Sequence, residues 1–274
     1  MSVAGGLYKA FDNAKRMGAE CIQIFGASPR QWQARIPSKE DIKTYKEEEE
    51  RSKISPVYLH SAYLVNLASP SKEIRGKSIK NLSLHLKIAD LIGAQGLIFH
   101  VGSGKETSRE EAIKKVIFGM KTVLKNVPGR VKLLMENSAG GGSKLGANIS
   151  DFGELLKGAG SQRVKICFDT AHAYEAGIIK EYTKKNVKNL FDEWECQVGV
   201  ENIIVLHAND SKTKYNSHSD RHENIGEGFI GIDGFKALAG EKRIKDKAWI
   251  IETPGFDNEG PDKKNIDILK SLFK

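Results

Sequence analysis

Short apolar runs alternate along the chain with longer amphipathic stretches. Each apolar run is rich in β-branched or aromatic side chains and is followed by a loop, which is typical of a strand buried on both faces of a parallel sheet. The runs predict strands at residues 21–25, 57–60, 96–100, 131–136, 164–169, 203–207 and 248–252.

The stretches between these runs have the periodicity of helices. Ser38 precedes one of them and Ser108 starts another, each with acidic residues in the first turn, as helix N-termini prefer. The pattern predicts helices near residues 7–17, 39–53, 72–92, 108–126, 149–158, 179–199, 232–240 and 262–272.

Strand and helix alternate without a linker rich in Pro, Gly or Ser, so we expect a single α/β domain over residues 1–274 with a parallel sheet. Seven strands are visible, and a loop-like SVAGG segment precedes the first helix. A TIM (β/α)8-type barrel that lacks its first strand would have this pattern. An open, doubly wound sheet is the structural alternative.

Composition narrows the class of protein. The chain has 274 residues, 39% of them apolar, which is enough for one sizeable core. No apolar run is long enough for a membrane span, and the N-terminus does not resemble a signal peptide. Cys21 and Cys167 lie in apolar runs and Cys196 is isolated, which favours a reduced, cytoplasmic protein. Forty-three Lys and Arg against 35 Asp and Glu give a net charge of +8, which permits a polyanionic partner.

Side chains that could bind a metal ion lie where the predicted strands end. Six successive strands finish with, or are closely followed by, a side chain that can bind a metal ion. In a parallel barrel all these ends lie on one face. The loop that follows the sixth predicted strand adds an Asp and a His two residues apart. The nine candidates are His60, His100, Glu136, Asp169, His172, His207, Asp220, His222 and Glu252. The remaining histidines, His85 and His218, are interpreted as ordinary surface residues.

The candidate ligands are nitrogen and oxygen atoms, with no thiolate. This set favours Zn²⁺, with Mn²⁺ and Fe²⁺ as competitors. Nine residues are too many for one four-coordinate ion, but they suffice for two or three ions if one carboxylate bridges. Clustered divalent cations suit phosphoryl chemistry, because they bind the non-bridging oxygens and lower the pKa of a bound water.

Several longer motifs then resemble those of one family, endonuclease IV, the zinc-dependent apurinic/apyrimidinic (AP) endonucleases of DNA repair. The matching segments span nearly the whole chain. They are SVAGG at 2–6, PRQW at 29–32, HSAYLVNLASP at 60–70, FHVGS at 99–103, MENSAGGGSKLG at 135–146, CFDTAHAYEAG at 167–177, LHANDSK at 206–212, SDRHENIGEG at 219–228 and IIETPG at 250–255.

The resemblance implies a TIM barrel with three Zn²⁺ ions, some sites accepting Mn²⁺. One ion would be held by His60, His100 and Glu136. A second would be held by Glu136, Asp169, His207 and Glu252, with Glu136 bridging. The third would be held by His172, Asp220 and His222. Glu136 and Glu252 are the residues that the resemblance places closest to catalysis.

The implied reaction is hydrolysis of the phosphodiester 5′ to an abasic site in double-stranded DNA, which leaves a 3′-hydroxyl and a 5′-deoxyribose phosphate. Trimming of blocked 3′ ends is also implied, as is a monomeric protein. Arg30 and Tyr63 match positions that the family inserts at the lesion when the abasic nucleotide is flipped out, and Gln31, next to Arg30, is expected to contact the DNA as well. Lys212 and Arg221 are candidate phosphate contacts.

The sequence departs from the family pattern at its N-terminus, and two alternative functions remain. The family begins with a short strand that ends in a histidine, and here Met1 stands directly before Ser2, so we expect a barrel with two unpaired edges. A divalent-metal sugar isomerase or epimerase of the same barrel type would explain Glu136, Asp169, His207 and Glu252 but not the other candidates. A non-catalytic DNA-binding protein would leave the metal-type residues without a role.

Overall fold

Seven parallel strands form the centre of the protein in a computed structural model that describes residues 1–274. Each strand pairs with the next one along the chain, in the order β1-β2-β3-β4-β5-β6-β9. The strands are β1 Ile22–Phe25, β2 Val57–His60, β3 Gly96–His100, β4 Lys132–Glu136, β5 Val164–Asp169, β6 Ile203–His207 and β9 Ala248–Ile250. This sequential order confirms the barrel and excludes the doubly wound sheet, whose strand order reverses at the middle.

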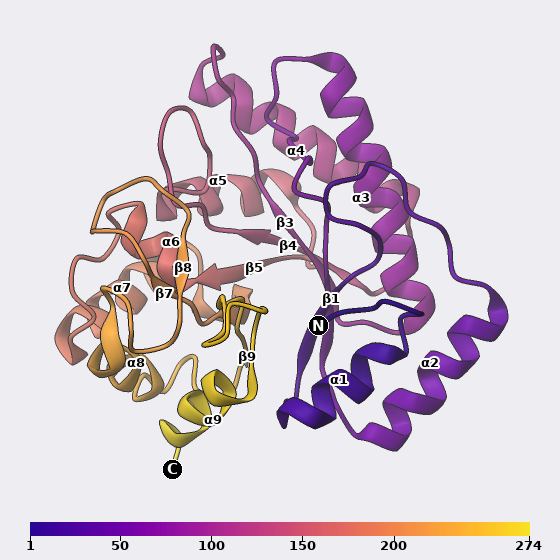
Figure 1. Cartoon of the computed structure of the whole chain (residues 1–274). Coiled ribbons are helices and arrows are strands. Elements are labelled where there is room, and N and C mark those ends of the chain that lie inside the picture. The colour runs from indigo at the N-terminus through magenta and orange to yellow at the C-terminus, as the bar shows by residue number, and fades with distance from the viewer.

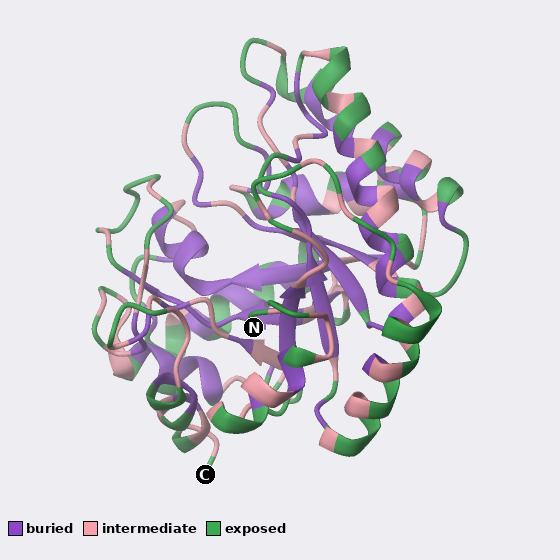
Figure 2. Ribbon diagram, turned by 45° about the vertical axis from the view of Figure 1, so that its right-hand side comes forward, coloured by how far each residue is buried: buried purple, intermediate pink, exposed green.

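Helices surround the strands and turn their polar faces to the outside (Figures 1 and 2). They are α1 Lys9–Met17, α2 Lys39–Ser52, α3 Lys72–Ile92, α4 Arg109–Asn126, α5 Ile149–Ala159, α6 Thr170–Glu175, α7 Lys184–Gln197, α8 Gly231–Ala239 and α9 Lys263–Ser271, with a 3₁₀ turn at Val200–Asn202. Ser38 and Ser108 accept hydrogen bonds from backbone N–H groups three residues later, which caps α2 and α4 as their sequences predict.

The core has two layers, because alternate residues of a strand point to opposite sides of the sheet. Outward-facing side chains pack against the helices in one large apolar cluster. Inward-facing side chains fill the interior of the barrel, and β2, β3, β4, β5, β6 and β9 each contribute one residue to this inner cluster. Its members are Tyr58, Ile98, Leu134, Cys167, Val205 and Ile250. Cys167 is thus a core residue.

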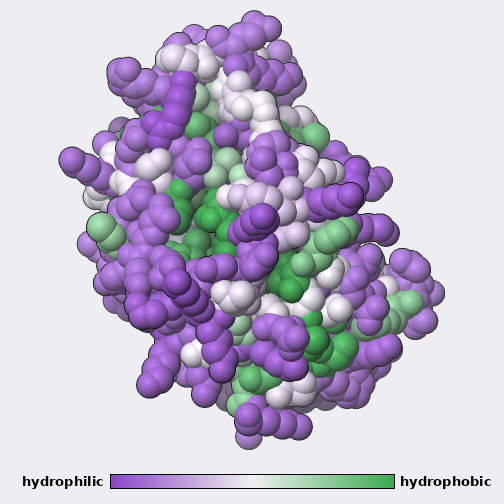
Figure 3. Space-filling view, turned by 90° about the vertical axis from the view of Figure 1, so that its left-hand side faces the viewer, coloured by the Kyte–Doolittle hydropathy of each residue, from purple (hydrophilic) through white to green (hydrophobic).

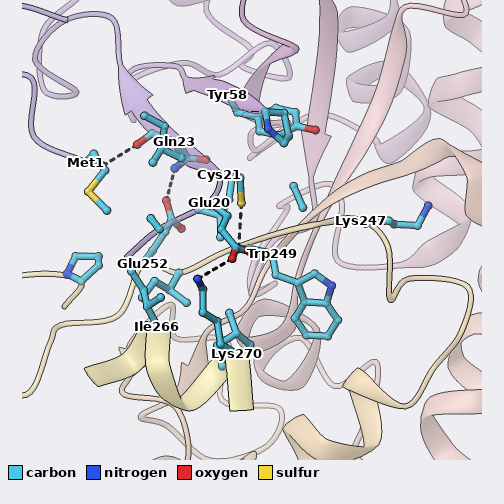
Figure 4. A pocket seen from close by; sticks show the side chains of 18 of the residues that line it. Met1, Glu20, Cys21, Gln23, Tyr58, Lys247, Trp249, Glu252, Ile266 and Lys270 are labelled. Carbon is cyan, nitrogen blue, oxygen red and sulfur yellow. Dashed lines mark hydrogen bonds and ion pairs between the residues drawn. The ribbon is translucent and has the colours of Figure 1, made fainter. Parts of the chain in front are cut away.

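The barrel does not close between β1 and β9. No backbone ladder joins these two edge strands, and a cavity of about 1100 Å³ lies along them (Figure 4). Two side chains of β1's segment bridge the opening: the Cys21 Sγ lies 3.6 Å from the Trp249 carbonyl oxygen, and the Gln23 amide donates to Glu252 at 2.6 Å. Seven strands with two unpaired edges are what a barrel lacking one strand should show.

The helix predicted at 179–199 is wrong at its start. It begins at Lys184, after the Thr183 cap, because Tyr182 is buried and donates its hydroxyl hydrogen to the Thr170 carbonyl. Residues 170–175 instead form the short helix α6, which the apolar periodicity does not predict.

Three further details were unexpected. The last strand ends at Ile250, so Glu252 stands two residues beyond it. His85 is no surface residue; it is 1% exposed and donates from Nδ1 to the Asn81 carbonyl oxygen. Asp210–Ser211 (β7) and His222–Glu223 (β8) form a small antiparallel ladder.

Candidate metal centre

The carboxylate of Glu136 lies at the centre of the face formed by the strand ends. Glu136 is the last residue of β4 and is 1% exposed. Its Oε2 lies 3.1 Å from His60 Nε2 and 3.6 Å from His100 Nδ1. Its Oε1 lies 2.9 Å from His207 Nδ1 and 3.5 Å from His172 Nδ1. One carboxylate therefore faces imidazoles on two sides, as a bridging ligand would.

Two more carboxylates surround His207 at the end of β6. Its Nδ1 is 3.2 Å from Glu252 Oε2 and 3.8 Å from Asp169 Oδ2. The other ring nitrogen, Nε2, lies 2.7 Å from Gln23 Oε1, and the Gln23 amide also donates to Glu252 Oε1. Gln23 on β1 therefore holds the imidazole and the carboxylate in place together. Together with Glu136, the side chains of Asp169, His207 and Glu252 form a second cluster.

A third group forms where the β7–β8 ladder returns to the barrel. Asp220 Oδ1 lies 3.3 Å from His172 Nε2 and 3.6 Å from His222 Nε2. His222 Nε2 is also 3.7 Å from Asp169 Oδ2. His172 comes from α6, whereas Asp220 and His222 come from the segment after β7. The two elements meet only because the chain folds back over the end of β5.

Hydrogen bonds set which nitrogen of each ring is free. The Nδ1 of His172 lies 2.8 Å from the Asn137 carbonyl oxygen, and the Nδ1 of His60 lies 2.8 Å from the Ser61 carbonyl oxygen. A carbonyl can only accept, so each Nδ1 carries a hydrogen, and in the neutral ring Nε2 is the nitrogen with the lone pair. In both rings the free Nε2 points to the carboxylates, which is the arrangement of a metal-binding imidazole.

Two asparagines fix Asp169. Asn137 accepts from the backbone N–H of Asp169 at 2.6 Å and donates to its carbonyl oxygen at 2.9 Å. Asn209 donates to Asp169 Oδ2 at 2.7 Å and accepts from the backbone N–H of Glu252 at 2.7 Å. Asn209 therefore sets the position of two candidate ligands.

The carboxylates and imidazoles of the cluster shift one another's pKa values, in competition with the effect of burial. Burial opposes ionisation of Glu136, but the imidazoles of His100 and His207 hold its pKa well below its usual range. Burial likewise opposes the charge on His172, yet Asp169 and Asp220 raise its pKa well above the ordinary value. For His100 burial prevails and lowers its pKa.

This donor set fits divalent cations. The four carboxylates form ion pairs with histidines alone; no Lys or Arg lies within 4.0 Å of them. The Nε2 atoms of His172 and His222 are buried without a hydrogen-bond partner. Because a buried, unpartnered polar atom costs free energy, a cation that accepts these lone pairs would stabilise the site. The clusters within ligand spacing are His60–His100–Glu136, Glu136–Asp169–His207–Glu252, Asp169–His172–His222 and His172–Glu175–Asp220.

Comparison with known proteins agrees with this geometry. A model of the family described as "Xylose isomerase-like TIM barrel" matches residues 11–272. The "Probable endonuclease 4" of Aquifex aeolicus is 36% identical over 275 residues, covering 100% of this chain and 96% of its own length. That of Solibacter usitatus is 38% identical, with coverage of 98% and 93%. The chain belongs to the endonuclease IV family.

Solved structures extend the comparison. Endonuclease IV from Thermus thermophilus superposes with a TM-score of 0.87 at 32% identity, covering 99% of this chain and 96% of that one. A D-tagatose 3-epimerase-like protein superposes with a TM-score of 0.74 at 21% identity, covering 98% and 94%. At that identity the epimerase-like protein shows the shared barrel alone.

The residues expected to contact DNA do not join the cluster. Arg30 and Gln31 lie exposed on the loop after β1. Tyr63 is 55% exposed and stands at the rim, its ring centre 5.9 Å from that of His60 and 5.5 Å from that of Phe25. Tyr63 therefore lies beside the candidate ligand His60, and its backbone N–H donates to Pro29 in the same loop as Arg30 and Gln31.

Sequence reasoning missed four polar residues of the site. Gln23, Asn137 and Asn209 orient the candidate ligands, and the buried Glu175 on α6 adds a carboxylate beside His172 and Asp220. A signal existed for Gln23, the single polar residue in the predicted strand 21–25. Asn137 and Asn209 follow strand-end ligands by one and two residues, but asparagine after a strand is also an ordinary turn residue.

Proposed function

We propose that this protein is a zinc-dependent AP endonuclease, which hydrolyses the phosphodiester on the 5′ side of an abasic site in double-stranded DNA. Membership of the endonuclease IV family supports a nuclease of DNA repair. The observation that carries the finer proposal is the position of Glu136, whose two oxygens face separate groups of imidazoles. No helix has the length and apolar character needed to cross a membrane.

Each candidate residue has a distinct role in this proposal. His60, His100 and Glu136 hold one ion, and Glu136, Asp169, His207 and Glu252 hold a second. His172, Asp220 and His222 hold the third. When bound, such ions lower the pKa of a water and neutralise the charge that develops on phosphate oxygens. We assign Zn²⁺ as the resident metal because all the donors are nitrogen and oxygen atoms, with Mn²⁺ able to replace it in part.

The chain's own residues then orient the reaction. Gln23 fixes His207 and Glu252 together, so the carboxylate of Glu252 keeps one oxygen directed to the cluster. Asn209 holds Asp169 in the same way. Burial of Glu136, Asp169 and His207 excludes bulk water from the inner side of the site. Substrate would therefore approach from the outer side, where Asp220 is half exposed and His100 and Glu252 are partly exposed.

The same site would trim blocked 3′ ends, since that reaction also breaks a phosphodiester and leaves a 3′-hydroxyl. Arg30, Gln31 and Tyr63 are proposed to contact the DNA around the lesion. Exposed aromatic and basic side chains beside a phosphoryl-transfer site suit a flipped nucleotide.

A nicking assay with metal analysis tests the proposal. The substrate is a duplex with one abasic-site analogue, and the matched control is the same duplex with an intact nucleotide. We expect cleavage 5′ to the analogue, about three zinc ions per chain, and slow loss of activity in chelator. No cleavage with full metal content would overturn the function, and one or two ions per chain would favour a sugar isomerase.

Tyr63→Ala tests the DNA contacts. Because Tyr63 lies at the rim and contacts rings rather than carboxylates, we expect the preference for the abasic duplex to fall about tenfold, as loss of 1–3 kcal/mol of stacking implies. Zinc content, measured on the same sample, should stay at the wild-type value. Loss of zinc from this variant would mean that Tyr63 supports the metal ligands instead.

A further inference from the structure

Glu175 is a buried carboxylate that the proposed nuclease site does not use. It is the last residue of α6 and is fully buried. Asp169, the residue before α6, accepts the backbone N–H of His172 with its side chain and so caps the helix. Residues three apart on a helix share a face, so α6 presents His172 and Glu175 to the same side.

The two oxygens of Glu175 have different surroundings. Oε1 accepts hydrogen bonds from the Ser211 hydroxyl at 2.7 Å, the Thr213 hydroxyl at 3.2 Å and the Arg221 backbone N–H at 3.3 Å. These contacts join α6 to the segment that carries Asp220. Oε2 is buried and has no hydrogen-bond partner. Oε1 thus accepts three hydrogen bonds, whereas Oε2 accepts none and could bind a metal ion.

Glu175 lies close to two of the candidate ligands. Ligand atoms of Glu175, His172 and Asp220 all lie within 4.8 Å of one another. Atoms bound to one zinc ion at roughly 2.0–2.2 Å cannot lie much more than 4 Å apart, so small movements suffice to bring these three onto one ion. His172 Nε2, like Glu175 Oε2, is buried without a partner. Two residues of this group, Glu175 and His172, therefore each carry a buried polar atom without a partner.

We propose that Glu175 is a fourth protein ligand of the ion held by His172, Asp220 and His222. This inference rests on the proposed function, since it deepens the description of one of its metal sites. Three protein ligands leave an open position on a tetrahedral ion; a fourth would fill it, and a zinc ion can still expand to five-coordinate to take a substrate oxygen. The third ion would then be held more tightly than by three protein ligands alone, and it should leave more slowly than it does when Glu175 cannot bind it.

The test compares Glu175→Gln with two controls by metal analysis during dialysis against chelator. The glutamine can keep its carbonyl oxygen toward Ser211 and Thr213 while an amide replaces Oε2, so the contacts between the two segments persist and the ligand is lost. Glu227→Gln removes an equal charge from an exposed position nearby. Thr213→Val weakens the tie to Oε1 without touching Oε2.

We expect Glu175→Gln to lose one zinc ion per chain at least tenfold faster than wild type, with both controls close to wild type. The circular dichroism and thermal unfolding of the zinc-free proteins should match. Equal ion content and equal release rates for Glu175→Gln and wild type would overturn the proposal, and would leave Glu175 as a structural residue that joins α6 to the segment carrying Asp220. Faster release from Thr213→Val alone would also overturn it.

A second variant covers the case in which Glu175→Gln does not reach the native fold. Glu175→Asp keeps the charge but withdraws the carboxylate by one methylene, so it should also release one ion early. Wild-type release from Glu175→Asp would contradict a ligand role. Metal content is read without any cleavage assay, so an inactive enzyme that retains three ions would disprove the nuclease and leave the Glu175 assignment standing.

Discussion

At the scale of single residues, the position of Glu136 explains why the other ligands gather where they do. It ends the central strand β4, which has three strands of the sheet on each side. Its carboxylate is therefore within reach of side chains from both halves of the barrel. The imidazoles of His60 and His207 come from strands on opposite sides of it and approach different oxygens. A single residue thus couples two groups of candidate ligands.

Glu136→Gln should break this coupling. The amide keeps the volume of the carboxylate but removes the negative charge that two groups of imidazoles face. We expect loss of up to two ions per chain and a fall in cleavage of at least about 100-fold, since even residues outside the ligand set cost 10–100-fold at such sites. Metal analysis and the nicking assay measure both effects. Full metal content together with full activity would contradict a bridging role.

The three cysteines should differ in reactivity. Burial raises the pKa of the Cys21 thiol to about 11 and that of Cys167 to about 12, whereas Cys196 is exposed. A raised pKa means less thiolate, the reactive form, at any given pH; at pH 8 about one Cys21 in a thousand is ionised. Titration with a thiol reagent should therefore label one cysteine per chain promptly and three after denaturation. Cys196→Ser should abolish the prompt reaction, and any prompt labelling left in that variant would contradict the raised pKa of the partly exposed Cys21 or of the buried Cys167.

Much of the site could be predicted residue by residue, because a parallel barrel brings all its strand ends to one face. His60, His100, Glu136, Asp169 and His207 each end a strand. Glu175 could not be predicted in this way. Its position depends on the short helix α6 and on a fold-back of residues 211–221, and neither leaves a periodic signal in the sequence.

At the scale of elements, the segment between β7 and α8 carries two candidate ligands, and the carboxylate of Asp210 joins its two ends. Asp210 is fully buried and accepts from five backbone N–H groups. Its Oδ1 accepts from Ser211 and Ile230, and its Oδ2 accepts from Gly226, Gly228 and Gly231. The backbone of residue 228 can come this close to the carboxylate because Gly228 has no side chain. A Cβ at this position would lie 2.5 Å from Asp210 Oδ1.

Asp210→Asn should loosen this segment. Whichever oxygen becomes an amide, at least two buried N–H groups lose their acceptor, which costs about 2–5 kcal/mol in the free energy of unfolding. Urea unfolding measures the loss, and metal analysis should show weaker retention of the ion near His222. Asp233→Asn, at an exposed position on α8, is the control and should be neutral. Equal stability of the two variants would show that Asp210 does not organise the segment.

Element boundaries were predictable where apolar periodicity was strong and not elsewhere. The strands at 57–60, 96–100, 164–169 and 203–207 have the predicted bounds. The last strand stops at Ile250 because β9 pairs with β6 only over residues 248–250. The helix α7 starts late because its predicted first residues, Ile179 and Tyr182, pack into the core outside any helix.

At the scale of the whole molecule, the surface combines a hydrophilic exterior with a few apolar hollows, one of which is visible on the face in Figure 3. The net charge of +8 favours a polyanion over the whole surface, so charge alone does not locate the DNA. The barrel does. Helix C-termini lead into the N-terminal ends of the strands, opposite to the metal cluster. A lysine in such a last turn, for example Lys125 in α4, therefore lies far from the site.

Arg30→Ala and Lys125→Ala should consequently differ in their effect on DNA binding. Each removes one positive charge, so a purely global field would weaken binding equally in both. If Arg30 contacts a phosphate, its removal alone should lower affinity for abasic and intact duplexes alike and reduce the slope of log K against log salt by about one unit. Fluorescence anisotropy at several salt concentrations, in chelator to prevent cleavage, separates the two cases. Equal slopes for the two variants would show that the loop after β1 does not contact the DNA backbone, and that the positive charge acts only at a distance.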